Sequence, residues 1–320
     1  MKKVVLLLVV CAMVLLPFSG TLASAQEADL TIGLSFPSLA FAWFAFLEQA
    51  VFDKAEILGV EVVSLEAENR VDRQMAIVED MIIKEVDGVL LVPIEIEAIV
   101  PAVLALNAAG IPVVTVDRRL AEGAAEVLAH VGADNLEGGR KAGQFIVDKL
   151  TEKYGEPRGV VIELYGTPGA GPAIDRSAGF NEVLAQHPGI TVHTRTAYFG
   201  RADGMRVMED VIIGIPEFDA VFGANDEMIL GGLEAMKASG VVDVEATITI
   251  GFDALPDALA SIDQGILDAT IEQFPGRQAS DGFQVLIDNL REGTVPTEPI
   301  TLIEPTVITA ANLGDAEKAF

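Results

Sequence analysis

The chain has 320 residues, enough for two domains of ordinary size. It carries 48 acidic and 21 basic residues, which gives a formal net charge of -27 at pH 7. A nucleic-acid-binding protein needs a basic surface, so the charge excludes that class and disfavours strongly anionic ligands. The acidity suits a secreted protein that must stay soluble.

The N-terminus has the pattern of an export signal. Lys2 and Lys3 precede an uncharged apolar run from Val4 to Leu16, and Ala23-Ser24-Ala25 forms an A-x-A cleavage site. We therefore predict that residues 1–25 are a signal peptide and that the mature protein is periplasmic or extracellular. A transmembrane anchor is the alternative, but the apolar run is short for a span.

Beyond this region, short apolar runs alternate with segments of helical periodicity. The expected strands are Leu30–Ser35, Val60–Leu65, Gly88–Val92, Pro112–Val116, Gly159–Tyr165, Thr191–Ala197, Ala220–Ala224, Thr247–Phe252 and Ala269–Gln273. The expected helices are Trp43–Leu58, Asp72–Lys84, Ala98–Ala109, Glu137–Leu150, Ala173–Gln186, Ala202–Ile213, Glu227–Ser239, Leu255–Gln264 and Gln278–Arg291. A short extended piece, His130–Asn135, leads into the helix Glu137–Leu150, and the alternation then starts again. We therefore predict an α/β protein with two doubly wound parallel-sheet lobes and a hinged cleft between them.

Polar side chains follow four of the expected strands. Asp117 and Arg118 end the strand Pro112–Val116, and Asn225, Asp253 and Gln273 end three later strands. In an open α/β sheet, ligands bind just beyond the carboxyl ends of the strands. The pattern therefore predicts one shared polar site.

No motif of an enzyme accompanies these residues. The glycine-rich stretch Gly166–Gly171 lacks the lysine and hydroxyl of a phosphate loop, and His130, His187 and His193 lack metal-ligand spacing. The only cysteine, Cys11, lies inside the apolar N-terminal run, so the mature chain has no thiol. We predict no catalytic residue, no metal and no cofactor.

The remaining interpretation is sugar binding. A sugar offers C–H faces to aromatic rings and hydroxyls that both donate and accept hydrogen bonds. Four aromatic residues can supply the faces: Phe41, Trp43, Phe44 and Phe199. Arg176 adds a guanidinium to the polar groups at the strand ends.

Six motifs in order make the chain similar to the ribose-binding-protein branch of the type I periplasmic solute-binding proteins. They are Val114-Thr115-Val116-Asp117-Arg118, Val131-Gly132-Ala133-Asp134-Asn135, Asp175-Arg176-Ser177-Ala178-Gly179-Phe180, Phe222-Gly223-Ala224-Asn225-Asp226-Glu227-Met228, Gly251-Phe252-Asp253-Ala254-Leu255-Pro256-Asp257 and Ala269-Thr270-Ile271-Glu272-Gln273-Phe274-Pro275. Each is weak alone, but together they span nearly the whole mature chain.

The resemblance implies a protein that closes two lobes on a monosaccharide or polyol and delivers it to an ABC transporter permease. The residues expected to bind the sugar are Phe41, Trp43, Phe44, Asp117, Arg118, Arg176, Phe199, Asn225, Asp253 and Gln273. The expected N-terminal lobe is 26–133 plus 275–298, and the expected C-terminal lobe is 134–274 plus 299–320. The corresponding crossings lie near Ala133–Asn135, Gln273–Pro275 and Pro296–Thr301.

One departure from the branch concerns the loop before the first helix. Phe41 stands where the branch usually has a polar asparagine, and Pro37 replaces a small polar residue. We therefore expect this end of the pocket to be more apolar than in a ribose-binding protein.

The site residues also have simpler interpretations. Asn225 and Asp253 precede helices and could be N-caps, and Arg118 could form a solvated ion pair with Asp117. Trp43 and Phe44 could be core residues of the first helix. Gln273 could act only as part of the hinge, and the loop residue Phe199 favours exposure or ligand contact.

Two other functions share these features. A sugar-responsive regulator of the lactose-repressor type has this fold, but it needs a basic helix-turn-helix where this chain has an export signal. A secreted α/β enzyme could use the carboxylates on a carbohydrate. We expect a monomeric binding protein, and docking of the loaded form to a chemoreceptor remains compatible with transport.

Overall fold

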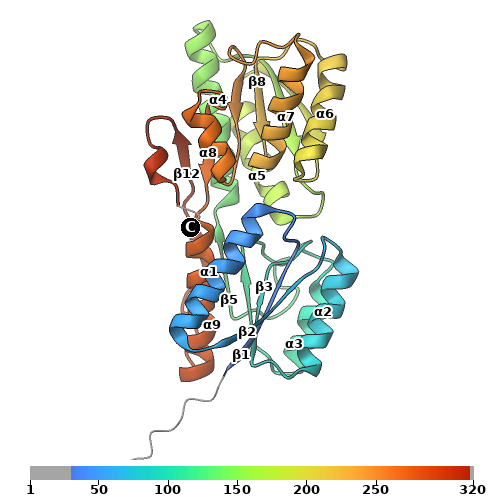
Figure 1. Ribbon diagram of the computed structural model, residues 1–320, viewed down its shortest axis with the longest axis vertical. Coiled ribbons are helices and arrows are strands. Elements are labelled where there is room, and N and C mark those ends of the chain that lie inside the picture. The colour runs from blue at the N-terminus through green and yellow to red at the C-terminus, as the bar shows by residue number, and fades with distance from the viewer. Residues whose placement is uncertain (1–29, 318–320) are drawn as a thin grey trace, which may run out of the picture.

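The computed structural model describes residues 30–317, so the predicted signal peptide lies outside the described range. Two lobes follow one another along the long axis of the molecule, and each contains one six-stranded sheet covered by helices on both faces (Figure 1). The predicted fold class is thereby confirmed. Within residues 30–317, no helix is both long enough and apolar enough to cross a membrane.

The first lobe contains a parallel sheet with the strand order β11-β5-β4-β3-β1-β2. Its strands are β1 (Thr31–Phe36), β2 (Glu61–Glu66), β3 (Gly88–Leu91), β4 (Val113–Val116), β5 (Ala129–Ala133) and β11 (Ile300–Ile303). Its helices are α1 (Ala42–Leu58), α2 (Val71–Ile83), α3 (Val100–Ala108) and α9 (Pro275–Glu292). Helices α1 and α9 share one buried cluster, which includes Leu47, Phe283 and Phe36. A second cluster joins α2 and α3 to the sheet through Met81 and Val103.

The second lobe repeats this wiring in the order β12-β10-β9-β8-β6-β7, with an antiparallel strand β12 at the edge. Its strands are β6 (Arg158–Tyr165), β7 (Gly189–Thr196), β8 (Ala220–Gly223), β9 (Ile248–Ile250), β10 (Ala269–Glu272) and β12 (Thr306–Thr309). Its helices are α4 (Asn135–Tyr154), α5 (Gly171–Leu184), α6 (Arg201–Gly214), α7 (Asp226–Ser239), α8 (Pro256–Asp263) and the short η1 (Leu313–Asp315). Phe180 and Phe222 stack at the centre of its core, with ring centroids 4.5 Å apart.

The two edge strands β11 and β12 are absent from the sequence prediction, and one expected crossing is wrong as a result. β11 pairs in parallel with β5, with Ile300 opposite His130, so it belongs to the first sheet. The third crossing therefore runs from Ile303 to Thr306 and not through Pro296–Thr301, and residues 299–303 lie with the first lobe. Each of these strands has only four residues, which is too short for a clear periodic pattern.

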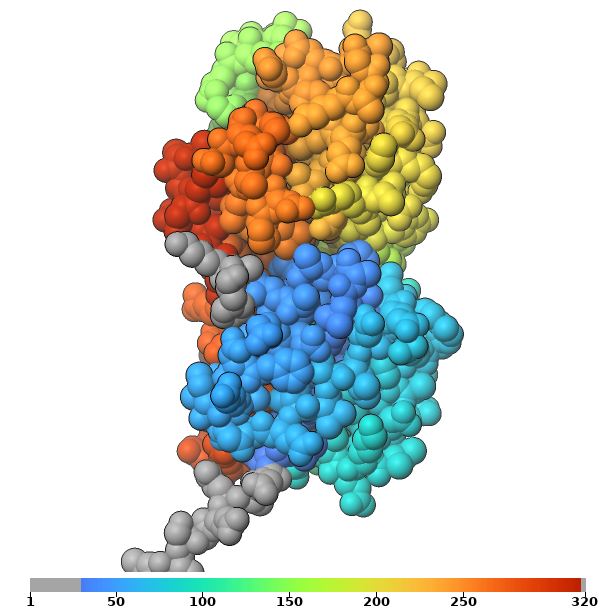
Figure 2. All heavy atoms as spheres, in the orientation of Figure 1, coloured from blue at the N-terminus to red at the C-terminus, as the bar shows by residue number. Residues whose placement is uncertain are grey.

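The lobes touch at several points besides the crossings. Arg119, after β4, forms a two-pronged ion pair with Asp175 of α5, at N–O distances of 2.9 and 3.1 Å. The Ile96 backbone N–H donates to the Gly169 carbonyl at 3.2 Å. In Figure 2 the atoms around the start of α1 meet the atoms of the second lobe.

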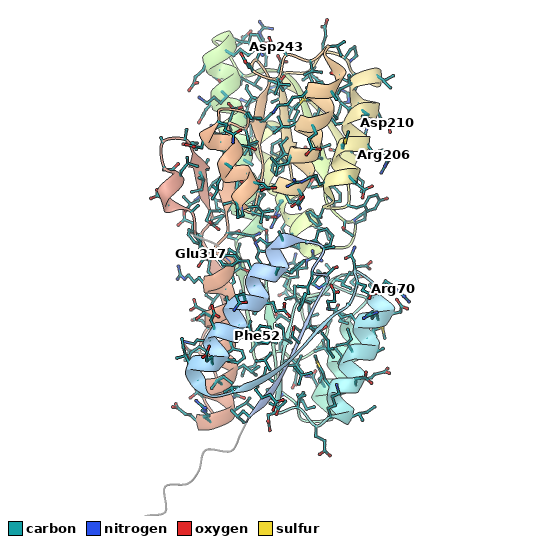
Figure 3. The ribbon with its side chains drawn as sticks, viewed as in Figure 1. Phe52, Arg70, Arg206, Asp210, Asp243 and Glu317 are labelled. Carbon is teal, nitrogen blue, oxygen red and sulfur yellow. The ribbon has the colours of Figure 1, made fainter. Side chains whose placement is uncertain are left out.

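The C-terminal segment also spans the hinge. Glu317 follows β12 and η1, and its carboxylate accepts the backbone N–H groups of Gly276 and Arg277 at 2.8 and 3.2 Å. These donors belong to the first turn of α9, where N–H groups have no partner within the helix. Figure 3 shows Glu317 beside the end of α9 nearest the second lobe. The second lobe therefore caps a helix of the first.

Candidate functional site

The first wall of the site comes from the loop between β1 and α1. Phe41 stands directly before α1, packs edge to face against Phe44 with ring centroids 6.2 Å apart, and lines the cavity described below. Trp43 and Phe44 lie in the first turn of the helix, with their rings edge to face at 5.2 Å. Both are buried in the core of the first lobe and both line the cavity described below. The two alternatives considered for them, core and pocket, are therefore compatible.

Asp117 and Arg118 continue this wall at the end of β4. Asp117 adopts a positive φ of 61°, a conformation that non-glycine residues rarely adopt and that clusters at functional sites. Its carboxylate lies 3.5 Å from the Arg118 Nε. The Arg118 guanidinium donates to the Ile94 carbonyl at 3.0 Å and lies 5.3 Å from the Phe44 ring centroid. Both residues are buried, so the structure rules out a solvated surface pair.

Arg176 is the central group of the second wall. It projects from the second turn of α5, is 3 % exposed and lies with its guanidinium carbon 3.6 Å above the Phe252 ring. Its N–H groups donate to the Ala224 carbonyl at 2.7 Å and to Gln273 Oε1 at 3.2 Å, and approach Asp253 Oδ1 at 3.4 Å. These contacts hold the guanidinium plane in one orientation.

Asn225 and Phe199 form a connected pair at the ends of β8 and β7. The Asn225 side chain accepts the Met228 N–H at 2.9 Å and so caps α7, as the capping alternative predicted. Its amide nitrogen also donates to the Phe199 carbonyl at 3.1 Å. Phe199 has a positive φ of 63° and is buried. Of the two alternatives expected for it, exposure is therefore wrong, and ligand contact stays a prediction.

Asp253 and Gln273 complete the second wall. Asp253 is not an N-cap, because α8 begins after Leu255. Its carboxylate instead accepts the Gln273 amide at 2.6 Å. Gln273 ends β10 at the second crossing, so it belongs both to the site and to the hinge region.

These side chains converge on one cavity between the lobes. Its walls contain all ten predicted residues: Phe41, Trp43, Phe44, Asp117, Arg118, Arg176, Phe199, Asn225, Asp253 and Gln273. Pro172, at the start of α5, also lines it and was not predicted. The cavity measures about 30 Å³, which is room for about two water molecules. A larger molecule can enter only if the lobes or their side chains move.

The charges of the cavity balance. Two carboxylates, Asp117 and Asp253, face two guanidinium groups, Arg118 and Arg176. Burial raises the pKa of Asp253 to about 7, although Arg176 opposes the shift, and burial likewise raises the pKa of Asp117. Burial lowers the pKa of both arginines, while the carboxylates counteract it. With all four groups ionised the cavity has no net charge, which suits an uncharged polar ligand.

Two residues that hold the site in place were missed. Asn135, at the start of α4, accepts the Arg176 Nε–H at 2.8 Å. Asp226 accepts the Leu255 N–H at 2.8 Å and the Thr270 hydroxyl at 2.7 Å, and so supports the turn that presents Asp253. Both lie in recognised motifs, but the sequence offers no signal that separates these contacts from helix capping.

A larger hollow, of about 1520 Å³, runs along residues of β4, β5 and β11. Its floor includes half-exposed Leu302 and exposed Ile300, and one end reaches Asp117 and Asp175. Among residues 30–317, no group of His, Cys, Asp and Glu is arranged to hold a metal ion.

Fold and site together define a two-lobed α/β binding protein with a polar, aromatic-lined cavity at its hinge. Residues 32–294 match the model of the periplasmic binding protein domain. The chain belongs to the periplasmic binding protein family. This family membership confirms the resemblance inferred from the six motifs.

Relatives and solved structures agree with this assignment. The chain is 37% identical over 282 residues to the ribose import binding protein RbsB of Bacillus subtilis (strain 168), covering 87% of this chain and 88% of the relative. The Caulobacter myo-inositol binding protein, bound to myo-inositol, superposes with a TM-score of 0.84 at 30% identity, covering 91% and 97% of the two chains. The binding protein of the arabinose ABC transporter from Shewanella sp. ANA-3, bound to L-arabinofuranose, gives a TM-score of 0.82 at 29% identity and covers 89% and 93%.

Proposed function

We propose that the protein binds one uncharged monosaccharide or polyol between its lobes and delivers it to an ABC transporter permease. The observation that carries this proposal is the cavity itself, where charge-balanced polar groups and aromatic rings from both lobes meet. Carboxylates and guanidinium groups satisfy sugar hydroxyls, and the rings cover C–H faces. The names of the relatives give ribose, myo-inositol and L-arabinofuranose as their ligands, which supports a neutral polyhydroxy compound as the ligand of this protein.

Within this proposal the ten residues divide by role. Asp117, Arg118, Arg176, Asn225, Asp253 and Gln273 would hydrogen-bond the hydroxyls, and Phe41, Trp43, Phe44 and Phe199 would pack on the ring. Asn225 caps α7 with its oxygen and bonds the Phe199 carbonyl with one amide hydrogen, so its second amide hydrogen would serve the ligand. Phe41 makes the first wall more apolar than an asparagine would, so a ligand with fewer hydroxyls on that side than ribose is favoured.

Ligand entry requires the hinge to open. The cavity is too small for a sugar as it stands. The contacts Arg119–Asp175 and Ile96–Gly169 hold the lobes together around it. We propose that the lobes rotate about the three crossings and that the ligand stabilises the closed form by bridging both walls. Small-angle scattering with and without saturating ligand should show a more compact liganded protein, and identical profiles would reject the hinge motion.

A ligand screen tests the function. Purified mature protein is heated with D-ribose, L-arabinose, D-galactose, xylitol and myo-inositol, and with D-glucuronate and ribose 5-phosphate as charged controls. A ligand at 100 times its dissociation constant adds about 2.7 kcal/mol to the stability of the folded state. We expect one neutral compound to raise the melting temperature and the anions to have no effect. Calorimetry should then give one site per chain and chromatography should recover the sugar unchanged. Turnover would favour the carbohydrate-active enzyme.

The location and the partners belong to the same proposal. The periplasmic binding protein family, together with Lys2, Lys3 and the apolar run after them, supports an exported protein that works as a monomer outside the cytoplasmic membrane. Docking of the liganded form to a chemoreceptor is compatible with it. Mass spectrometry of the exported protein should find an N-terminus near Gln26, and an exported chain that retains Met1 would contradict the cleavage.

A further inference from the structure

We infer that Asn135 is a positioning residue, which fixes Arg176 in the orientation that the ligand meets. The inference rests on the proposed function and names a residue that does not line the cavity. Asn135 is 6 % exposed, and its side chain is not needed to cap α4, because Asp134 already does so through the Glu137 N–H at 2.9 Å. A buried amide without a capping role needs another partner.

That partner is Arg176. Asn135 Oδ1 accepts the Nε–H of Arg176 at 2.8 Å, while its Nδ2 donates to the Ala133 carbonyl at 3.3 Å. The amide therefore joins the guanidinium to the backbone of the first crossing. Gln273 Oε1, at the second crossing, accepts from a terminal nitrogen, Nη2, of the same guanidinium at 3.2 Å. Arg176 is thus held between two hinge crossings.

The effect of Asn135 on Arg176 follows from how the five N–H groups of the arginine are used. Nε–H is taken by Asn135, and the terminal nitrogens serve Ala224, Asp253 and Gln273. With Nε fixed, the guanidinium can only present its outer edge to the cavity. Without Asn135, the buried Nε–H has no acceptor, and only the contacts of the terminal nitrogens hold the plane over the Phe252 ring.

Close packing of α4 against α5 sets the distance between Asn135 and Arg176. A Cβ added at Gly139 of α4 would lie 2.1 Å from the Arg176 carbonyl oxygen, and one added at Gly179 of α5 would lie 1.9 Å from the Leu136 carbonyl oxygen. The two backbones are therefore in contact next to the Asn135–Arg176 pair. Because α4 and α5 belong to the same lobe, the hydrogen bond persists when the hinge opens.

The test compares Asn135→Ala with Asn135→Asp. Asn135→Ala removes the acceptor, and we expect about tenfold weaker binding of the neutral sugar that gives the largest stabilisation in the screen above. Asn135→Asp keeps an oxygen toward Nε, and we expect binding within about threefold of the wild type. Asn181→Ala is the control, because Asn181 lies on the same helix as Arg176 but bonds Glu163 and Ser177. It should leave affinity unchanged.

A double-mutant cycle separates positioning from general damage. Lysine has no Nε–H at the same place, so Asn135→Ala should cost nothing further in the Arg176→Lys protein. If the double variant loses affinity by the product of the two single losses, the inference is overturned. An Asn135→Ala protein that binds within twofold of the wild type would also overturn it.

A measurement without ligand keeps this inference distinct from the proposed function. In ¹⁵N-labelled protein the Arg176 Nε–H resonance, assigned by its loss in Arg176→Lys, should be protected from exchange with water. Asn135→Ala should remove the protection, and Asn181→Ala should not. A screen without a single binder would refute the proposed function. Protection that survives Asn135→Ala would refute the positioning role, whatever the screen shows.

Discussion

The two walls of the cavity have the same origin and different chemistry. Both come from the carboxyl ends of parallel strands in lobes with matching strand order. In the second wall, Arg176, Asp253 and Gln273 bond to one another and are already oriented. In the first wall, aromatic rings dominate, and among the described residues we find no donor hydrogen-bonded to the Asp117 carboxylate. We therefore propose that the second lobe provides a rigid polar frame and that the first lobe provides the surface that selects the ligand.

The largest expected effect comes from the two arginines that represent these walls. Arg176→Lys leaves several buried acceptors without a donor, so we expect about 100-fold weaker binding, or about 2.7 kcal/mol. Arg118→Lys loses one carbonyl contact and ring stacking, and we expect about tenfold. Calorimetry measures both, and melting temperatures without ligand control for folding. An equal loss of affinity in the two variants would contradict the proposed difference between the second wall as a polar frame and the first wall as the selecting surface.

A smaller effect should follow when the contact between the walls is weakened. The pair Arg119–Asp175 joins the lobes without lining the cavity and is partly exposed, so it should contribute about 1 kcal/mol at most to closure. We expect Arg119→Gln to weaken ligand binding about fivefold, and the double variant with Asp175→Asn to weaken it no further.

The control is the pair Arg140–Glu182, which has similar exposure but lies within the second lobe. Arg140→Gln should leave affinity unchanged, since this pair does not respond to closure. A similar loss in both proteins would mean that charge, and not contact between the lobes, determines the affinity.

The smallest expected effect is an opposite response of the two lobes to acid. Burial lowers the pKa of His130, in the first lobe, to about 4, so its stabilisation is complete above pH 6.5 and falls as the pH drops toward 4. Burial raises the pKa of Glu272, in the second lobe, to about 7. Its stabilisation is complete below pH 4.5 and is lost as the pH rises through 7.

Calorimetry between pH 4 and 8 measures these responses, which should amount to a few degrees of melting temperature. His130→Gln should reduce the decrease in melting temperature on the acid side, and Glu272→Gln should reduce the decrease on the neutral side. The prediction fails for either residue whose substitution leaves the pH dependence of the melting temperature unchanged.

The sequence predicts the lobes and the cavity because both depend on local patterns. Apolar runs that end in Asp117, Asn225 and Asp253 mark strand ends, and parallel strands place these ends at one edge. The edge strand β11 escaped because its sheet membership depends on pairing with β5, more than 160 residues earlier in the chain. The Asn135–Arg176 contact was not predicted because it depends on how closely α4 and α5 pack. Residue types alone do not determine that packing.

Helix α9 affects how the chain can become folded. The sheet of the second lobe, apart from its edge strand, and the helices on it come from one continuous segment, 135–272. The first lobe needs α9, whose Ala279, Phe283 and Leu286 are fully buried in the cluster that contains Phe36 and Val116. During synthesis or passage through a membrane, these groups emerge only after residues 135–272, which contain the second sheet except for its edge strand. The lobe that begins the chain is therefore the last to complete its core, and until then its apolar α1 face is open to chaperones and to aggregation.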